Sequence, residues 1–228
     1  MTGATNLTAW SALLVVLIVA VSACGDEEQA KVRTLPEDLE KALRPGQYRS
    51  EEFKPSVSFR VGKGWSTYTP EAPDVLRISY GELGEFGFTN IHEVYKPTTT
   101  GAPNVVEAPE DIVGWFRRHP YLETTEPEPA TVGGVEGVQF DVVVEDVPES
   151  YRSVCLGIIG IGTDCVDIAR FGDHQILAHP SFVRSRLIVL EDIEGETVTM
   201  TLSSRPAEFE EFAPEAQKVL ESVEWTGE

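Results

Sequence analysis

Four segments of the chain alternate apolar and polar side chains with a period of two, and this pattern constrains the fold more than any other feature. Because neighbouring side chains of a β-strand point to opposite faces, such alternation is typical of a strand with one buried face. The four segments are residues 57–61, 76–80, 138–145 and 197–203. Two less regular segments, 86–95 and 182–190, are also predicted as strands, and Gly133-Gly134 predicts a hairpin turn.

Two other segments repeat apolar residues every three or four positions, which is the spacing of one helix face. The first, residues 109–118, begins with a proline and two acidic residues, which favour a helix N-terminus, and ends before Pro120. The second, residues 209–223, contains Pro214 and is predicted as either two short helices or one kinked helix. A short helix is also expected at 36–43. Strands joined by short turns, with the helices set apart, favour an α+β fold with a mostly antiparallel sheet.

The charge of the chain restricts its partners. The sequence contains 38 acidic and 18 basic side chains in 228 residues, a formal charge of −20, and its apolar fraction is 41%. That apolar fraction is too high for a disordered acidic tail. The sign of the charge excludes nucleic acid as a partner, since phosphate binding needs clustered Lys and Arg. The acidic residues are predicted to form a solvated surface, and a concentrated patch that steers a basic partner is the alternative.

The N-terminal region predicts export. The first 23 residues carry no charged side chain, and residues 12–21 form an unbroken apolar run. A bilayer-spanning helix needs about 20 apolar residues, so this run fits a signal peptide better. It ends in Val21-Ser22-Ala23-Cys24, which resembles the lipobox of bacterial lipoproteins. The resemblance implies cleavage before Cys24 and a diacylglyceryl group, with fatty acids such as palmitate, on its thiol. The alternative is that Cys24 is the first cysteine of an ordinary secreted or single-pass protein.

This interpretation divides the chain into three parts. Residues 1–23 are the signal peptide, residues 24–45 a lipid-anchored polar tether, and residues 46–228 a single globular domain of about 180 residues, which is enough for a sizeable core. The domain is then expected on the extracytoplasmic face of the cell membrane, held there by the lipid on Cys24.

Cys155 and Cys165 are predicted to form a disulfide, because an exported domain permits oxidation. Closing so short a loop stabilises a fold by roughly 2–3 kcal/mol in the chain-entropy model. Metal ligation is the alternative, although two thiols at this spacing are a weak zinc signal. The loop between them is apolar and glycine-rich, and either caps the core or contacts a partner or a lipid-like ligand. Its large apolar residues are Leu156, Ile158, Ile159 and Ile161.

Sequence motifs for catalysis or metal binding are absent. His92-Glu93 begins like a zinc protease helix, but Lys96 stands where the second histidine must be, in a strand-like segment. The sequence has no Gly-x-Ser-x-Gly elbow, phosphate-binding loop or calcium loop. The densest set of metal-ligand residue types is His174 and His179 with the adjacent Asp173. The two histidines are interpreted as exposed loop residues, and a metal site in this loop is the alternative. We therefore predict no cofactor, no metal and no enzymatic activity.

The order of several short features resembles the PsbP-like domain, which also occurs in actinobacterial surface lipoproteins. A strand leads into Gly-x-Gly-Trp at 57–65, and a central helix and a Val-Gly-Gly-x-x-Gly hairpin follow. A Thr-rich strand, a C-terminal helix and a closing Val223-Glu224-Trp225 complete the order. The resemblance covers roughly residues 55–226. It implies an α/β/α sandwich used for accessory and binding roles rather than catalysis, and no functional residue is transferred by it.

Three hypotheses for function follow from the sequence. The first is a non-catalytic, lipid-anchored module that binds an envelope protein or a small apolar ligand. The second is an envelope hydrolase whose site is assembled from scattered Asp, Glu and His residues. The third is a structural lipoprotein with no specific ligand. A buried acid or histidine with a shifted pKa in a deep cleft would favour the enzyme, and an empty apolar groove would favour the ligand binder.

Overall fold

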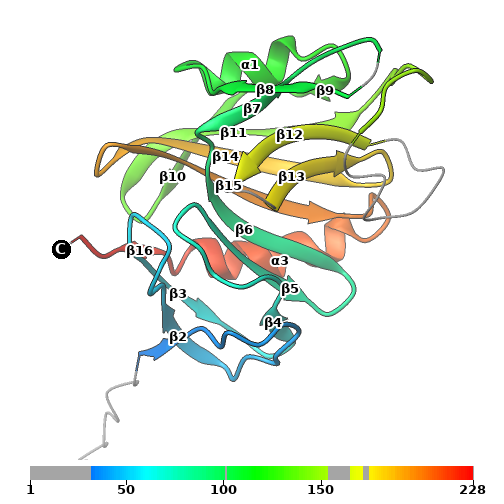
Figure 1. Ribbon diagram of the computed structural model, residues 1–228. Helices are drawn as coiled ribbons and strands as arrows, with labels where there is room; N and C mark the ends of the chain where they lie inside the picture. Colours follow the sequence, from blue (N-terminus) through cyan, green and yellow to red (C-terminus); the bar gives the residue numbers. More distant parts are fainter. Residues whose placement is uncertain (1–31, 101, 154–164, 172–174, 228) are drawn as a thin grey trace, which may run out of the picture.

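The computed structural model describes residues 32–100, 102–153, 165–171 and 175–227, whose strands form three sheets (Figure 1). The central sheet has eight strands: β4 (Trp65–Thr67), β5 (Val75–Tyr80), β6 (Gly84–Asn90), β9 (Leu122–Thr124), β10 (Glu128–Val132), β11 (Val135–Val144), β14 (Arg184–Ile193) and β15 (Glu196–Ser204). They are all antiparallel, in the order β10–β11–β14–β15–β6–β5–β4, with β9 paired to β11.

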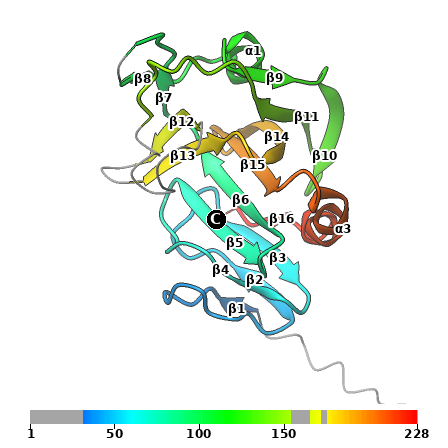
Figure 2. The ribbon, with the colours of Figure 1, turned by 90° about the vertical axis from the view of Figure 1, so that its right-hand side faces the viewer.

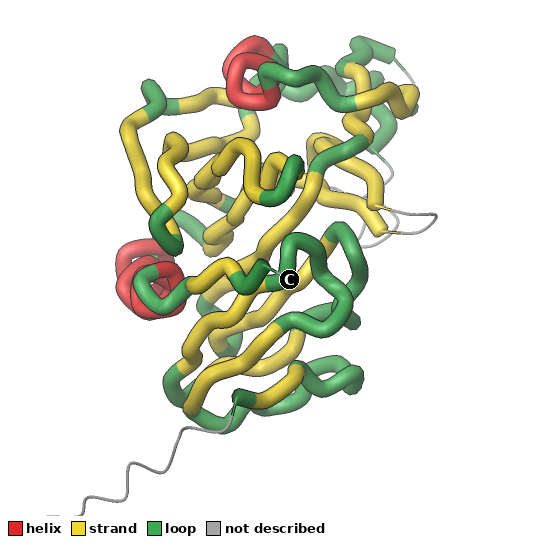
Figure 3. The backbone as a smooth tube through the Cα atoms, turned by 90° about the vertical axis from the view of Figure 1, so that its left-hand side faces the viewer, coloured by secondary structure: helices red, strands yellow, loops and turns green. Residues whose placement is uncertain are grey.

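Two smaller sheets cover this central sheet. The N-terminal sheet consists of β1 (Arg33–Thr34), β2 (Gly46–Arg49), β3 (Val57–Val61) and β16 (Glu224–Trp225). The third sheet has the order β13–β12–β7–β8 and consists of β7 (Glu93–Lys96), β8 (Asn104–Glu107), β12 (Cys165–Phe171) and β13 (Gln175–Pro180). Figure 3 shows far more strand than helix in the backbone, with the helices at its periphery.

Within the described residues, the helices are α1 (Ile112–Arg118) and α3 (Phe209–Leu220). Asp111 caps α1, because its carboxylate accepts a hydrogen bond from the Gly114 N–H at 2.7 Å. The helix therefore begins three residues after the predicted start. In the part of the chain that the structure describes, neither helix is long and apolar enough to cross a bilayer.

Two hydrophobic cores lie on opposite faces of the central sheet. The first contains Phe86 and Phe88 of β6 and is closed by the N-terminal sheet and α3. The second contains Phe140 of β11 and is closed by the third sheet and α1. In Figure 2, β14 and β15 lie between α1 and α3. A single domain with mostly antiparallel sheets and two helices confirms the predicted α+β class.

The period-two alternation correctly located the strands β3, β5, β11 and β15, and Gly133-Gly134 is the turn between β10 and β11, with both residues at positive φ. The segment 86–95 is two strands rather than one, because the chain leaves the central sheet after Asn90 and joins the third sheet at Glu93. The C-terminal segment is one helix that continues through Pro214.

The predictions for the N-terminal part of the domain need correction. Residues 36–43 contain turns and an isolated bridge from Ala42 to Ser66 instead of a helix. Residues assigned to the tether also belong to the domain, since β1 pairs with β2 and Leu43 is buried in the first core. The globular part therefore extends to at least Arg33. The predicted signal peptide and Cys24 lie outside the described residues.

Candidate functional site

A cavity of about 670 Å³ lies between the central sheet and the third sheet. Its floor is formed by β4, β5, β6, β15 and β14, and its roof by β12, β13 and the turn after β13. In Figure 1, β12 and β13 run across the front of the central sheet. Ligand-binding cavities of proteins have volumes of about 300–1,000 Å³, so this cavity can hold a small molecule.

The register of the strands explains why the floor is hollow. Arg77, Gly87, Thr201 and Leu187 are successive cross-strand neighbours on β5, β6, β15 and β14. Side chains directly opposite one another in an antiparallel sheet point to the same face. Gly87 has no side chain and leaves room for the stem of Arg77, whose Cγ lies 3.1 Å from where a Cβ at Gly87 would be. The row is therefore low over the short side chain of Thr201, between Arg77 and Leu187.

The floor changes from polar to apolar across the sheet. In the next row, Ser79, Glu85, Ser203 and Ser185 are cross-strand neighbours on the same four strands. The side chains over β5, β6 and β15 are thus mainly hydroxyl-bearing or charged. Above β14, the cavity is lined by Leu187 of the floor and by apolar side chains of the roof and of α1, namely Ile168, Leu177, Val183 and Phe116.

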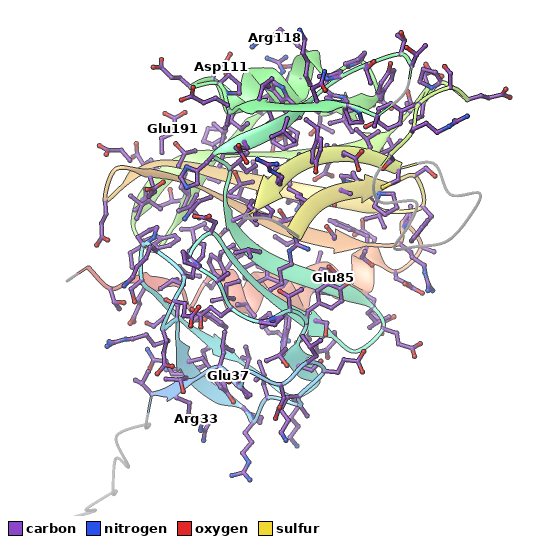
Figure 4. The ribbon with its side chains drawn as sticks, viewed as in Figure 1. Arg33, Glu37, Glu85, Asp111, Arg118 and Glu191 are labelled. Atoms are coloured by element: carbon purple, nitrogen blue, oxygen red, sulfur yellow. The ribbon has the colours of Figure 1, made fainter. Side chains whose placement is uncertain are left out.

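Tyr68, Glu85 and Arg77 form a charged cluster at the polar end of the cavity. The Tyr68 hydroxyl is hydrogen-bonded to the Glu85 carboxylate. Burial raises the pKa of Tyr68 to about 12, and the negative charge of Glu85 adds to this shift. Burial also raises the pKa of Glu85, against the hydrogen bond from Tyr68 and the charge of Arg77, which lower it. Figure 4 places Glu85 on β6, below β13.

His179 lines the cavity from β13 and is only 6% exposed. Burial lowers its pKa to about 4, so the imidazole is neutral at pH 7. Its Nδ1 lies 3.5 Å from the carbonyl oxygen of Pro180, and this contact is a hydrogen bond in the tautomer that carries the proton on Nδ1. The prediction that His179 is an exposed loop histidine is therefore wrong. Its strand partner is the buried Val166, and both side chains face the central sheet.

Three polar atoms of the cavity wall are buried without a hydrogen-bond partner among the described residues. They are His179 Nε2, Thr201 Oγ1 and Glu208 Oε2. The serine hydroxyls of the floor differ from these, because they bond to one another: Ser66 Oγ lies 2.9 Å from Ser79 Oγ, and Ser185 Oγ lies 2.6 Å from Ser203 Oγ. A buried polar group without a partner costs about 1–3 kcal/mol, so these atoms lower the stability of the fold.

Apart from His179, the residues singled out in the sequence lie away from this cavity or outside the described residues. The residues outside the described part of the chain are Cys155, the loop residues Leu156, Ile158, Ile159 and Ile161, and also Asp173 and His174. The disulfide and the contact loop therefore stay predictions. Cys165 is buried at the start of β12. His92 directly precedes β7 and does not lie in a helix. Its Nε2 is 3.3 Å from Asp74 Oδ1. Within the described ranges, no three His, Cys, Asp or Glu side chains are grouped to hold a metal ion.

Sequence reasoning missed the cavity because its residues come from strands that are distant in the chain. The one local signal was the combination of Gly87 within a strand and alternating hydroxyl residues at 199–203. A glycine inside a strand often marks the close approach of another group, but it does not say which face is hollow.

Comparisons with known proteins give little to add. No family model and no curated protein matches the chain. Among solved structures, the crystal structure of LpqN, described as involved in cell envelope biogenesis of Mycobacterium tuberculosis, matches at 10% identity with a TM-score of 0.31. The match covers 80% of this chain and 85% of LpqN. Similarity at this level carries no argument about function. The fold and the site define an α+β domain with an open cavity between two of its sheets.

Proposed function

We propose that this protein is a lipid-anchored, extracytoplasmic module that binds a small ligand without catalysing a reaction. The observation that carries the proposal is the cavity of about 670 Å³ between the central sheet and the third sheet. The lipobox resemblance at Cys24 supports the anchor. The resemblance to PsbP-like domains, which serve binding and accessory roles, supports the absence of catalysis.

Exposed aromatic side chains at the cavity give further support. Tyr68 is 41% exposed and Phe182 is 45% exposed, and both line the cavity. They come from the segments after β4 and after β13, so one belongs to the floor and the other to the roof. Aromatic side chains that stay partly exposed beside a concave surface are typical of binding sites, because they add apolar contact area when a ligand covers them.

Binding of the uncharged dye Nile red tests the cavity. We expect its fluorescence to rise and saturate at one dye per protein, and Phe182→Ala to weaken this binding about three- to tenfold, because the ring supplies about 1 kcal/mol or more of apolar contact. Leu39→Ala is the matched control, since Leu39 is exposed and does not line the cavity. Equal effects of the two substitutions, or no saturable binding, would exclude the cavity as a ligand site.

Native mass spectrometry of the protein, gently extracted from its own membrane, identifies the physiological ligand class. A discrete mass beyond the lipid on Cys24 is the expected result. A lipidated protein without additional mass favours the third hypothesis, a structural role, or contact with an envelope protein.

Replacement of Cys24 by serine tests the anchor. A serine hydroxyl does not replace the thiol that takes the diacylglyceryl group, so Cys24→Ser is expected to lose metabolically incorporated palmitate and to leave the washed membrane fraction almost completely. Cys155→Ser is the control, since it keeps the lipidation site. If Cys24→Ser stays in the membrane to the same extent as the unchanged protein, Cys24 is not the anchor.

An envelope hydrolase is the second candidate, and Glu85 is the observation that favours it. A carboxyl group whose pKa is raised by burial in a cavity is typical of general acids and bases. The serine pairs of the floor point the other way, because a hydroxyl nucleophile needs an adjacent base rather than a second hydroxyl. Turnover of p-nitrophenyl esters or glycosides that is lost in Glu85→Gln would establish the enzyme and exclude the non-catalytic module.

A further inference from the structure

The charged side chains of the domain are distributed unevenly along the chain. Residues 32–65 contain seven basic and five acidic side chains, whereas residues 66–228 contain ten basic and 30 acidic ones. The acidic excess of the domain therefore lies after residue 65, and its N-terminal part is slightly positive. In Figures 1 and 2, β2 and β3 lie at one end of the molecule and α1 at the opposite end. Such an uneven distribution favours one orientation of a protein near a charged surface.

The basic side chains of the N-terminal part also differ in their partners. After residue 65, seven of the ten basic side chains form ion pairs with described residues. In residues 32–65, the ion pairs between described residues are limited to that of Lys41 with Asp38. The exposed basic side chains of this part that form no ion pair with a described residue are Arg33, Arg44, Arg49, Lys54, Arg60 and Lys63. These charges are available to an anionic partner outside the chain.

The N-terminal sheet presents the basic side chains on its outer surface. Arg49 of β2 and Arg60 of β3 each follow a buried neighbour, Tyr48 and Phe59, so both point away from the first core. Glu224 of β16 lies beside them, but its carboxylate accepts hydrogen bonds from neutral side chains of β2 and β3 and not from an arginine. We call this surface the basic face, and its members are Arg33, Arg44, Arg49, Arg60 and Lys63.

Exposed apolar side chains accompany the basic face. Val32 directly precedes β1 and is 42% exposed, and Leu39, between β1 and β2, is 58% exposed. Figure 4 shows Arg33, the residue after Val32, at the opposite end of the molecule from Arg118 of α1. Basic side chains beside exposed apolar ones are typical of protein surfaces that lie on anionic membranes, because the cations contact head groups while the apolar side chains enter the interface.

The anchor proposed at Cys24 brings the basic face to the bilayer. Arg33 follows Cys24 by nine residues. Nine residues of fully extended chain span at most about 30 Å, so β1 stays within that distance of the lipid-bearing residue. A tethered surface meets its partner at an effective concentration of the order of millimolar, so a contact that is weak in solution is sufficient to orient the domain.

We infer that the N-terminal sheet is the membrane-facing surface of this protein, with the basic face against anionic lipid head groups and Leu39 in the interface. The inference rests on the proposed lipid anchor and adds a preferred orientation of the domain to it. The third sheet and α1 then face away from the membrane, because they belong to the acidic part of the chain, which anionic lipids repel.

Photo-crosslinking to lipid tests the orientation. The lipidated protein, with p-benzoylphenylalanine in place of Leu39 or of Val106, is reconstituted in phosphatidylcholine vesicles with or without phosphatidylglycerol. Val106 is the matched position, because it is also an exposed apolar residue but lies on β8 of the third sheet. We expect the probe at position 39 to join phospholipid at least about threefold more often in the anionic vesicles, and the probe at position 106 to show no such increase.

Removal of two charges tests the basic face. With the probe at position 39, Arg49→Gln/Arg60→Gln should lower the crosslinking in anionic vesicles to its level in neutral ones. Lys96→Gln/Arg152→Gln is the matched control, since it removes the same charge from exposed side chains elsewhere and should leave the crosslinking unchanged. Both variants should keep the melting temperature of the unchanged protein, because all four side chains are exposed. Equal effects of the two variants would overturn the role of the basic face.

The outcomes separate the inference from the function on which it rests. A mature protein whose intact mass shows no lipid on Cys24 overturns the anchor, and the inference with it. A lipidated protein whose crosslinking from position 39 does not depend on phosphatidylglycerol overturns the orientation alone. In the native membrane, crosslinks from position 39 to protein instead of phospholipid would assign the basic face to an acidic protein partner and would overturn the membrane contact.

Discussion

Replacing Asp141 by asparagine is expected to lower the free energy of unfolding by about 2–3 kcal/mol. The Asp141 carboxylate, 14% exposed, accepts hydrogen bonds from Arg186 Nε at 2.8 Å and Arg184 Nε at 3.2 Å. The Arg184 guanidinium also lies 4.4 Å from the centre of the Phe209 ring, at the start of α3. Asparagine keeps the shape but not the charge, so two half-buried arginines lose their common counter-charge. The network joins β11, β14 and α3, and urea unfolding at pH 7 measures its contribution.

An exposed ion pair provides the control for this substitution. Arg117 and Glu126 are 2.8 Å apart, and the Glu126 side chain is 86% exposed. Pairs of this kind contribute about 0–1 kcal/mol, so Glu126→Gln should change the free energy of unfolding by less than about 0.5 kcal/mol. If both substitutions destabilise equally, the loss does not come from the burial of the Asp141 network.

The prediction of the strands succeeded where local pattern decides the outcome. Alternation identified β3, β5, β11 and β15, because each of these strands buries one face against a core. The prediction of a short helix at 36–43 failed, and the contacts of Leu43 and Thr67 show the reason. The chain there is held by tertiary contacts, since the backbone N–H of Leu43 donates to the Trp65 carbonyl at 2.8 Å and the Thr67 N–H to the Lys41 carbonyl at 3.0 Å. Such distant partners override a weak helix propensity.

The site was less predictable than the fold for a related reason. Arg77, Gly87, Thr201 and Leu187 become neighbours only through the register of four strands, and residue spacing along the chain carries no information about that register. His179 illustrates the consequence. It was interpreted as exposed, although its pairing with Val166 places it on the buried face of β13.

Between pH 6.5 and pH 4 the protein is expected to lose several kcal/mol of stability, because two histidines are buried in the neutral form. His119 and His179 are each less than a tenth exposed, and burial lowers the pKa of both to about 4. In the unfolded chain both titrate near 6.5, so the unfolded state binds more protons throughout this interval. Each histidine then contributes up to about 3 kcal/mol that is fully present above pH 6.5 and lost as the pH falls to 4.

The shifted pKa values of Asp141 and Glu85 do not cause a loss of stability between pH 6.5 and pH 4. The pKa of Asp141 is held below its ordinary value, because the hydrogen bonds from Arg186 and Arg184 outweigh the effect of burial, so its contribution disappears only below about pH 4. Burial raises the pKa of Glu85, so protonation of this group in the folded state makes the protein more stable as the pH falls. A steep loss of stability between pH 6.5 and pH 4 is therefore the signature of the histidines.

Urea unfolding of the protein and of the His119→Gln/His179→Gln variant at pH 7.5, 5.5 and 4.5 separates the histidines from the carboxyl groups. The variant still contains Glu85, Asp141 and every other acid, so the carboxyl contributions cancel when the two pH profiles are subtracted. Glutamine does not titrate, and the variant should lose much less stability between pH 7.5 and pH 4.5, whatever its absolute stability at pH 7.5. If the two profiles are parallel, the histidines are not buried as neutral groups in the folded protein.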